Sequence, residues 1–470
     1  METKHKYMQA GIGYTIGNYL VYGLAFLSIP IFSRMMSAND YGVYNTFMAY
    51  ESILFVIIGF ALHSSFKNAK YRYNEQFDTY VSCSYLFSLV SLAFFLCASF
   101  FLYIPLGRIL ALSRLELLLL VVYSFGSAII QYYSSYLSLK YEYKSYITVS
   151  VINMVMNVTL SVVFMVTVLS DNRSLGRIIG STIPLILIST VIILKQFKKA
   201  HPSGIREKWA FGLKYSLPII PHGVSQVILT QFDRIMINKM VGSSEAGIYS
   251  FAYNLYTIVM ITSTSIDNVW STWFYEKISS KDYIRIKERS TQMFYIMALF
   301  CAGIMLMSPE IIKVLAPSTY YDSVYSAIPV VCAAFFAFLY YFPSGVEYYL
   351  GKTYLIAVGT CGAAAVNIIL NYIFIRKYGY VAAAYTTLIT YMLYFIFHYI
   401  ISRKIYKERL FSVKSILGSS LIVLVNMFIS RTLENIFGIR ILITVVAGVI
   451  LIVIVRNMKD NNKISLNDNT

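Results

Sequence analysis

A few ionisable side chains interrupt the long apolar stretches of this sequence, and they are the residues most able to do chemistry. They are Lys214, His222, Asp233 and Arg234, which share residues 210–238, and Glu51 and Asp267, which stand alone. A charged side chain inside a membrane is costly and commonly marks the path of an ion or a substrate. The basic groups therefore predict binding of an anion, and the carboxylates predict handling of a proton or a cation.

The polar residues of 210–238 recur at steps that are multiples of three or four. They are Lys214, His222, Ser225 or Gln226, Thr230 and Asp233, with Pro218 at the missing turn. Such steps place side chains on one face of a helix. Because lipid cannot solvate a polar face broken by proline, this face is expected to line a water-filled cavity. The alternative is a packed bundle helix whose polar groups bond to neighbouring helices.

Arg and Lys bind phosphate through charge-assisted hydrogen bonds, so they are the first candidates for an anionic substrate. The candidate substrate-binding residues are Lys214, Arg34, Arg234, Lys239, His222 and Gln226. For Arg34 and Lys239 there is an alternative, because both fall at expected helix ends. Long basic side chains at such ends extend to the membrane interface without binding any substrate.

The candidate ion-coupling residues are Glu51, Asp233 and Asp267. Glu51 is the first of them, since it is a lone carboxylate within an apolar run and could load and release a proton or sodium ion. The alternative is a structural ion pair with a neighbouring Lys or Arg. Glu347, five residues before Lys352, is expected at the membrane interface.

No motif for covalent catalysis is present: the phosphate loop GxxxxGK[ST], HExxH, GxSxG and GxGxxG are all missing. The five cysteines show no CxxC spacing, so neither a disulfide framework nor a metal site is expected. The sequence thus predicts a protein that is not an enzyme and uses no cofactor. Energy would come from an ion gradient, a membrane potential or the substrate gradient.

Composition places all these residues in a polytopic membrane protein. Of 470 residues 58% are hydrophobic and 13% are charged, whereas soluble domains carry about 25% charge. The net charge of +17 resides in short loops, which is the membrane-orientation signal rather than a nucleic-acid-binding patch. With both termini in the cytoplasm, the inner loops carry more than twice as many Lys and Arg as the outer loops.

An all-α fold of about fourteen membrane-spanning helices follows from the apolar stretches, each about 20 residues or longer. They are residues 13–33, 42–65, 79–104, 114–136, 145–168, 175–195, 210–238, 246–274, 290–308, 324–349, 354–375, 381–401, 413–432 and 437–455.

An internal repeat relates the two halves of the chain. Residues 34–50 (RMMSANDYGVYNTFMAY) align without a gap to residues 239–255 (KMVGSSEAGIYSFAYNL), an offset of 205. In each copy a helix ends at a basic residue, and an acidic residue, Asp40 or Glu245, falls where it can cap the next helix. Asn153 and Asn157 echo Asn367 and Asn371, both pairs being four residues apart. An even number of spans separates the copies, so the halves share one topology.

These segments resemble a known family. TIGNYLVYGLAFLSIPIFSRMMSANDYGVYN near the start and GLKYSLPIIPHGVSQVILTQFDRIMINKMVGSSEAGIYSFAYNL in mid-chain look like the polysaccharide-repeat-unit flippases of the Wzx type. VNIILNYIFIRKYGYVAAAYTTL resembles a later part of the same family. That family belongs to the superfamily of lipid II flippases and multidrug and toxin extrusion transporters. Fourteen spans, where many polysaccharide flippases have twelve, leave the subfamily open.

The resemblance implies two six-helix lobes, residues 1–200 and 201–408, forming a V around a central cavity. An extra helix pair (409–456) and a cytoplasmic tail (457–470) would follow. It implies a flippase of the bacterial inner membrane that moves undecaprenyl-diphosphate-linked oligosaccharide by alternating access. Surface polysaccharide assembly (O-antigen of lipopolysaccharide, capsule or exopolysaccharide) would use it, with a polymerase and chain-length proteins as partners beside membrane lipids. The alternatives are a cation-coupled multidrug extruder of the same fold and a membrane polysaccharide polymerase or ligase.

Overall fold

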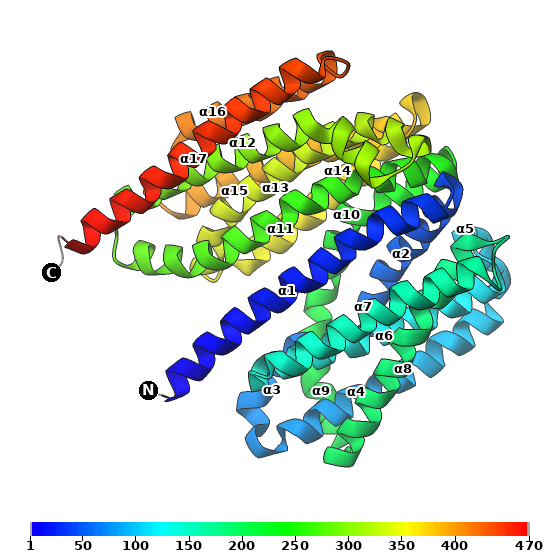
Figure 1. The fold of residues 1–470 in the computed structure, drawn as a ribbon. Helices are drawn as coiled ribbons and strands as arrows, with labels where there is room; N and C mark the ends of the chain where they lie inside the picture. The colour runs from blue at the N-terminus through cyan, green and yellow to red at the C-terminus, as the bar shows by residue number, and fades with distance from the viewer. Residues whose placement is uncertain (1, 468–470) are drawn as a thin grey trace. The chain divides into compact units, whose positions relative to one another are not determined.

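A computed structural model describes the backbone of residues 2–467. Side chains are described from Gly13 to Ile454, apart from Thr15, Ile16 and Asn18, and for Arg456. Every regular element in the described chain is a helix (Figure 1). The chain forms two compact units, Met1–Asn238 and Lys239–Thr470. The lobe boundaries given above stay a prediction.

The first unit is built from ten α-helices joined by short turns. They are α1 (Glu2–Met35), α2 (Ala38–Ile58), α3 (Phe66–Tyr73), α4 (Phe77–Phe101), α5 (Tyr103–Leu110), α6 (Arg114–Lys140), α7 (Tyr143–Val166), α8 (Arg173–Lys199), α9 (Ile205–Ser216) and α10 (Ile220–Met240). Helix α6 packs against α2, α4 and α8, and α1 runs along α7. The buried core lies among α3, α4 and α6, where the rings of Phe66, Tyr80 and Tyr132 meet.

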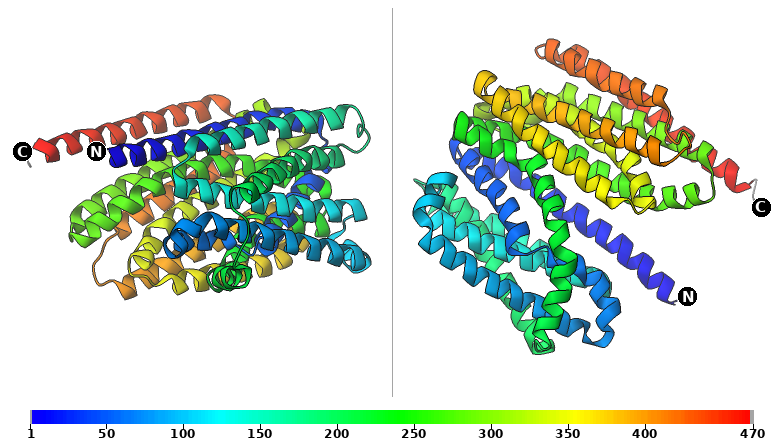
Figure 2. Two further views of the ribbon diagram at one scale, coloured as in Figure 1. Left: turned by 90° about the horizontal axis from the view of Figure 1, so that it is seen from below. Right: turned by 180° about the vertical axis from the view of Figure 1, so that it is seen from behind.

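The second unit contains seven α-helices, one of which lies at its centre. They are α11 (Ser243–Ser279), α12 (Tyr283–Leu315), α13 (Val324–Tyr349), α14 (Thr353–Tyr378), α15 (Val381–Ile405), α16 (Val413–Thr432) and α17 (Phe437–Asn467). Helix α13 is apolar on all sides, as expected of a helix with no lipid-facing or water-facing side, and it is almost wholly buried. Helices α16 and α17 both pack on α12 (Figures 1 and 2).

Each predicted membrane span coincides with a helix of the structure or, for residues 210–238, with the α9–α10 pair. Eleven described segments are long and apolar enough to cross a bilayer. The remaining three predicted spans coincide with α1, with the α9–α10 pair and with the more polar α11. The predicted span 210–238 is divided at Pro218, the residue at the missing turn of its polar face, because a short 3-10 helix, Leu217–Ile219, separates α9 from α10.

The repeat of 205 residues is reproduced at the helix ends. Helix α1 ends at Met35 and α10 at Met240, while α2 begins at Ala38 and α11 at Ser243. The predicted cap at Asp40 is confirmed, because Ser37 and Asp40 form a reciprocal capping box. Glu245 lies in the first turn of α11, where the helix dipole favours an acidic residue.

Candidate functional site

Glu51 lies on the buried side of α2, with only 6% of its surface exposed. Helix α6 supplies its neighbours, the hydroxyl of Ser127 and the ring of Tyr123. No Lys or Arg of the described side chains forms an ion pair with Glu51, so the structural alternative raised above is not supported. A buried carboxylate whose neighbours are hydroxyl groups can exist with or without a proton, which is what ion coupling requires.

Arg177 of α8 is a second buried ionisable group in this unit, and sequence reasoning missed it. Its Nη1 donates hydrogen bonds of 2.6 Å to Asn157 Oδ1 and of 2.6 Å to Ser161 Oγ, both on α7. Its guanidinium lies 3.6 Å from the ring centre of Phe32 and 4.9 Å from that of Tyr44. The available signal was an Arg inside the predicted span 175–195, two residues after its start.

Tyr123 connects the two buried groups, since Glu51 and Arg177 both act on its ring hydroxyl electrostatically. Together Glu51, Ser127, Tyr123 and Arg177 form a polar cluster, here called the Glu51 cluster, in the interior of the first unit. Because its members come from α2, α6 and α8, a change of charge at Glu51 would be felt by all three helices.

In the second unit, Glu347 of α13 and His398 of α15 form a fully buried pair. Glu347 Oε1 and His398 Nδ1 are 2.7 Å apart, and neither residue is exposed at all. Glu347 lies in the last turn of α13, so its expected depth near the membrane interface stays a prediction. Its side chain is nevertheless covered by protein, because α15 packs against α13.

The two asparagine pairs that correspond between the halves of the sequence contribute hydrogen bonds in both units. In the first, Asn157 of α7 accepts a hydrogen bond from Arg177 of α8. In the second, Asn371 of α14 accepts one from Thr386 of α15 and donates one of 3.0 Å to Asn367. Each pair thus ties the corresponding helix to its successor, which supports the duplication of the two halves.

The candidate substrate residues of the first unit are spread along the α9–α10 element. Lys208, Gly212 and Ser216 form the buried side of α9, so Lys214, midway between the last two, is exposed on the opposite side. Arg234 is 20 residues further on, which corresponds to up to about 30 Å along a helix. Lys214 and Arg234 thus lie on separate helices, with the 3-10 turn Leu217–Ile219 between them.

The other candidates have defined local environments. Arg34 is exposed at the end of α1, where Nη1 donates to Pro30 O over 3.1 Å, and Lys239 is exposed in the last turn of α10. Arg234 and Asp233 are buried; Arg234 Nη1 donates to Thr230 O over 3.2 Å. Three candidates are half-buried, namely His222 and Gln226 on α10 and Asp267 on α11.

Comparisons with known proteins place this architecture among membrane transporters. The family model described as "Polysaccharide biosynthesis protein" matches residues 8–274. A comparison with curated proteins found no match to the sequence.

Solved structures share the fold. An inward-closed lipid II flippase MurJ matches with a TM-score of 0.75 and 18% identity, covering 95% of this chain and 99% of its own. An inward-facing multidrug resistance MATE family transporter of the MOP superfamily matches with a TM-score of 0.63 and 13% identity, covering 81% of this chain and 97% of its own. A MOP superfamily transporter from Pyrococcus furiosus, described as having a binding pocket of reversed polarity, matches with a TM-score of 0.56 and 16% identity. The match covers 85% of this chain and 95% of that transporter.

The all-helical architecture, the internal repeat and the fold shared with MurJ and MATE transporters agree with the family match, which extends over more than half of the chain. The chain is a multi-pass membrane protein that belongs to the polysaccharide biosynthesis protein family.

Proposed function

We propose that this protein is a flippase that moves an oligosaccharide linked to undecaprenyl diphosphate across the bacterial inner membrane. One observation supports the proposal above all: the same chain matches the polysaccharide biosynthesis family and has the fold of a lipid flippase. The chain would change conformation around its substrate without breaking a bond, so it would not be an enzyme. A polymerase and chain-length proteins would use the oligosaccharide for O-antigen, capsule or exopolysaccharide.

Lys214 is the first substrate contact that we propose. It is exposed on the side of α9 opposite the packed side, so its ammonium group is accessible to a phosphate without rearrangement of the first unit. Because Lys214 is exposed and Arg234 is buried on a separate helix, the basic residues would contact the substrate at successive stages of transport. Positive charge at several depths would lower the cost of moving a diphosphate through the protein.

A substitution series at Lys214 tests the proposal. Surface polysaccharide would be measured in a strain that lacks its own flippase and expresses each variant, with membrane abundance measured by immunoblot. Lys214→Arg should retain part of the function, whereas Lys214→Gln and Lys214→Glu should lose at least about tenfold, as for one lost charge-assisted hydrogen bond. Lys198→Gln, at an exposed lysine of α8, is the matched control and should function normally. Full function of a well-expressed Lys214→Glu protein would exclude substrate binding at this residue.

A cation-coupled multidrug extruder is the second candidate, and the MATE transporters of similar fold support it. A site for organic cations should be acidic, whereas the accessible side of α9 carries Lys214. A measurement of drug resistance distinguishes the two functions. Expression in a drug-sensitive strain should leave resistance to cationic drugs unchanged if the protein is a lipid flippase, and should raise it several-fold if the protein is an extruder.

A further inference from the structure

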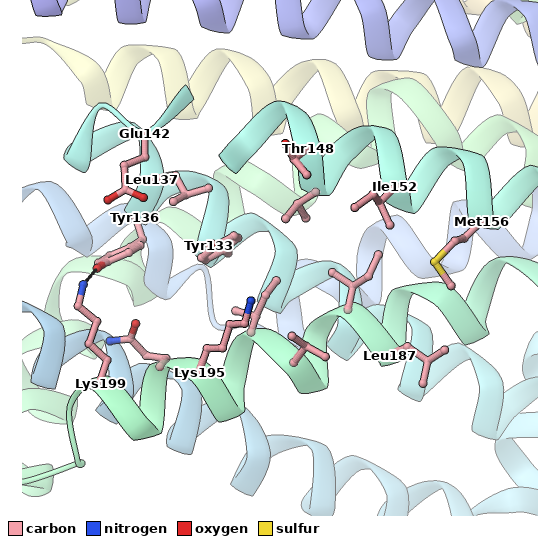
Figure 3. Close-up of a pocket in the computed structure, with 15 residues that line it drawn as sticks. Tyr133, Tyr136, Leu137, Glu142, Thr148, Ile152, Met156, Leu187, Lys195 and Lys199 are labelled. Atoms are coloured by element: carbon pink, nitrogen blue, oxygen red, sulfur yellow. Dashed lines mark hydrogen bonds between the residues drawn. The ribbon is translucent and has the colours of Figure 1, made fainter. Parts of the chain in front are cut away.

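A cavity of about 520 Å³ lies between α6, α7 and α8, away from the Glu51 cluster and away from Lys214 (Figure 3). Its size is within the range of pockets that hold small organic ligands. The helices separate here for a physical reason. At the other end of the α7–α8 hairpin, Gly180 lies directly against the backbone of Ser161, so the two helices touch there and diverge toward the cavity.

The cavity has a polar end and an apolar end. Lys195, Gln196, Lys199, Tyr136 and Glu142 lie at the end where α8 terminates, and Ile152, Met156, Leu187 and Val191 line the rest (Figure 3). From Lys199 to Leu187 is twelve residues, or about 18 Å along a helix. One leaflet of a hydrocarbon core about 30 Å thick is about 15 Å deep. The groove therefore has the length and polarity of one acyl chain that extends from the interface toward the membrane centre.

The apolar end is open to the surface of the first unit, where membrane lipid is present. Ile152, Leu187 and Val191 are each about half exposed, at 46%, 52% and 50%. Helix α7 buries little of its apolar surface inside the protein, so its outer side is available to membrane lipid. An acyl chain can thus enter the groove sideways from the bilayer.

Lys195 is the cation available to a ligand at the polar end. Lys199 is already engaged, because its Nζ lies 3.2 Å from Asp78 Oδ2 and donates to Tyr136 Oη over 2.6 Å. Lys195 is exposed, and among the described residues it forms no ion pair. Two lysines, Lys195 and Lys199, and one carboxylate, that of Glu142, line this end of the cavity, while the carboxylate of Asp78 is paired with Lys199 and Lys140.

We propose that this groove binds an anionic phospholipid, with one acyl chain along α7 and α8 and the phosphate on Lys195. Basic groups between membrane helices at the interface are the usual recognition element for anionic head groups. Glu142 restricts the space beside the phosphate and disfavours a head group with further negative charge. The lipid would hold α7 and α8 apart at their open end, a role distinct from that of a transported substrate.

The test uses the full-length protein purified in detergent and measured by native mass spectrometry with phosphatidylglycerol or phosphatidylcholine. One phosphatidylglycerol should remain bound where phosphatidylcholine does not. Lys195→Gln should weaken the binding of phosphatidylglycerol about fivefold, because one lysine near the membrane surface contributes about that much to the binding of an anionic lipid. Lys198→Gln should not change the binding. Val191→Trp, which fills the groove, should abolish binding, whereas Leu194→Trp, at an exposed residue outside the groove, should not.

Two results would overturn the proposal. One is equal binding of phosphatidylcholine, which would mean that the net negative charge of the lipid is not recognised. The other is unchanged phosphatidylglycerol binding by both Lys195→Gln and Val191→Trp, with both variants eluting as folded protein on gel filtration. Polyprenyl phosphate that displaces phosphatidylglycerol at equimolar concentration would assign the groove to the carrier lipid instead, which also contradicts the proposal.

Discussion

Two buried ionisable side chains of the first unit have different surroundings. The charge of Arg177 is compensated by hydrogen bonds to Asn157 and Ser161 and by two aromatic faces. Glu51 has the hydroxyl of Ser127 and the ring of Tyr123 beside it. Arg177 is therefore fixed in one charge state and in one place, whereas Glu51 can bind and release a cation. From this difference we expect Glu51 to be the coupling residue and Arg177 to have a structural role.

We expect Glu51→Gln to remove any dependence of transport on pH or sodium while the protein remains folded, because the amide keeps the shape of the side chain without its charge. Transport would be measured as surface polysaccharide restored over a series of external pH and sodium concentrations. Asp40→Asn, at a cap residue at the start of the same helix, is the control and should keep the ion response. An ion response that persists in a well-expressed Glu51→Gln protein would contradict the coupling role.

The Glu347–His398 pair leads to a prediction about stability. Removal of one partner leaves the other buried without its hydrogen bond, so Glu347→Leu should destabilise the protein by about 3–5 kcal/mol. The double variant Glu347→Leu with His398→Leu should be more stable than Glu347→Leu alone, because no polar group is then left unpaired. Thermal unfolding of the purified proteins measures both. The single variant His398→Leu is measured as well. If the loss of stability in the double variant equals the sum of the losses in Glu347→Leu and His398→Leu, the two side chains do not interact.

At the scale of helices, packing of α7 against α8 depends on small residues. A Cβ atom at Gly180 would meet Ser161 Cα at 2.3 Å, which is closer than any van der Waals contact. Gly180→Ala should therefore force α7 and α8 apart and destabilise the protein by about 1–3 kcal/mol.

The control for this prediction is Gly362→Ala in α14, where no atom lies within 4 Å of the added Cβ. That variant should be as stable as the native protein or slightly more so, because Ala has the higher helix propensity. Equal thermal stability of the two variants would show that α7 and α8 do not touch at Gly180.

At the scale of the whole molecule, the distribution of Lys and Arg predicts which loops lie on which side of the membrane. Ser170, Ser280 and Ser318 are all exposed in turns or at helix ends, so a Cys at each would be accessible to a water-soluble reagent. In a cysteine-free background, Cys at 170 and 318 should be labelled by an impermeant maleimide from outside and Cys at 280 should not. Labelling of the 170 and 280 variants from the same side would exclude the predicted topology.

The sequence by itself determined the helices, their order and the duplication. Apolar stretches of about 20 residues must form helices in a membrane, because lipid offers the backbone no hydrogen bonds. Pro218 lacks the amide hydrogen that would continue a helix, so the break after α9 was also predictable. The register of the repeat was correct to the residue at the ends of α1 and α10.

Which side of each helix is covered, and by what, was decided by the tertiary structure. Glu347 and His398 are 51 residues apart in sequence, and nothing in either segment indicates that α13 and α15 bring them together. Arg177 could be interpreted as the end of a span until Asn157, Ser161 and Phe32 were seen around it. Periodicity reports only the polarity of one helix's own sides, whereas burial and pairing depend on the neighbour that each side meets.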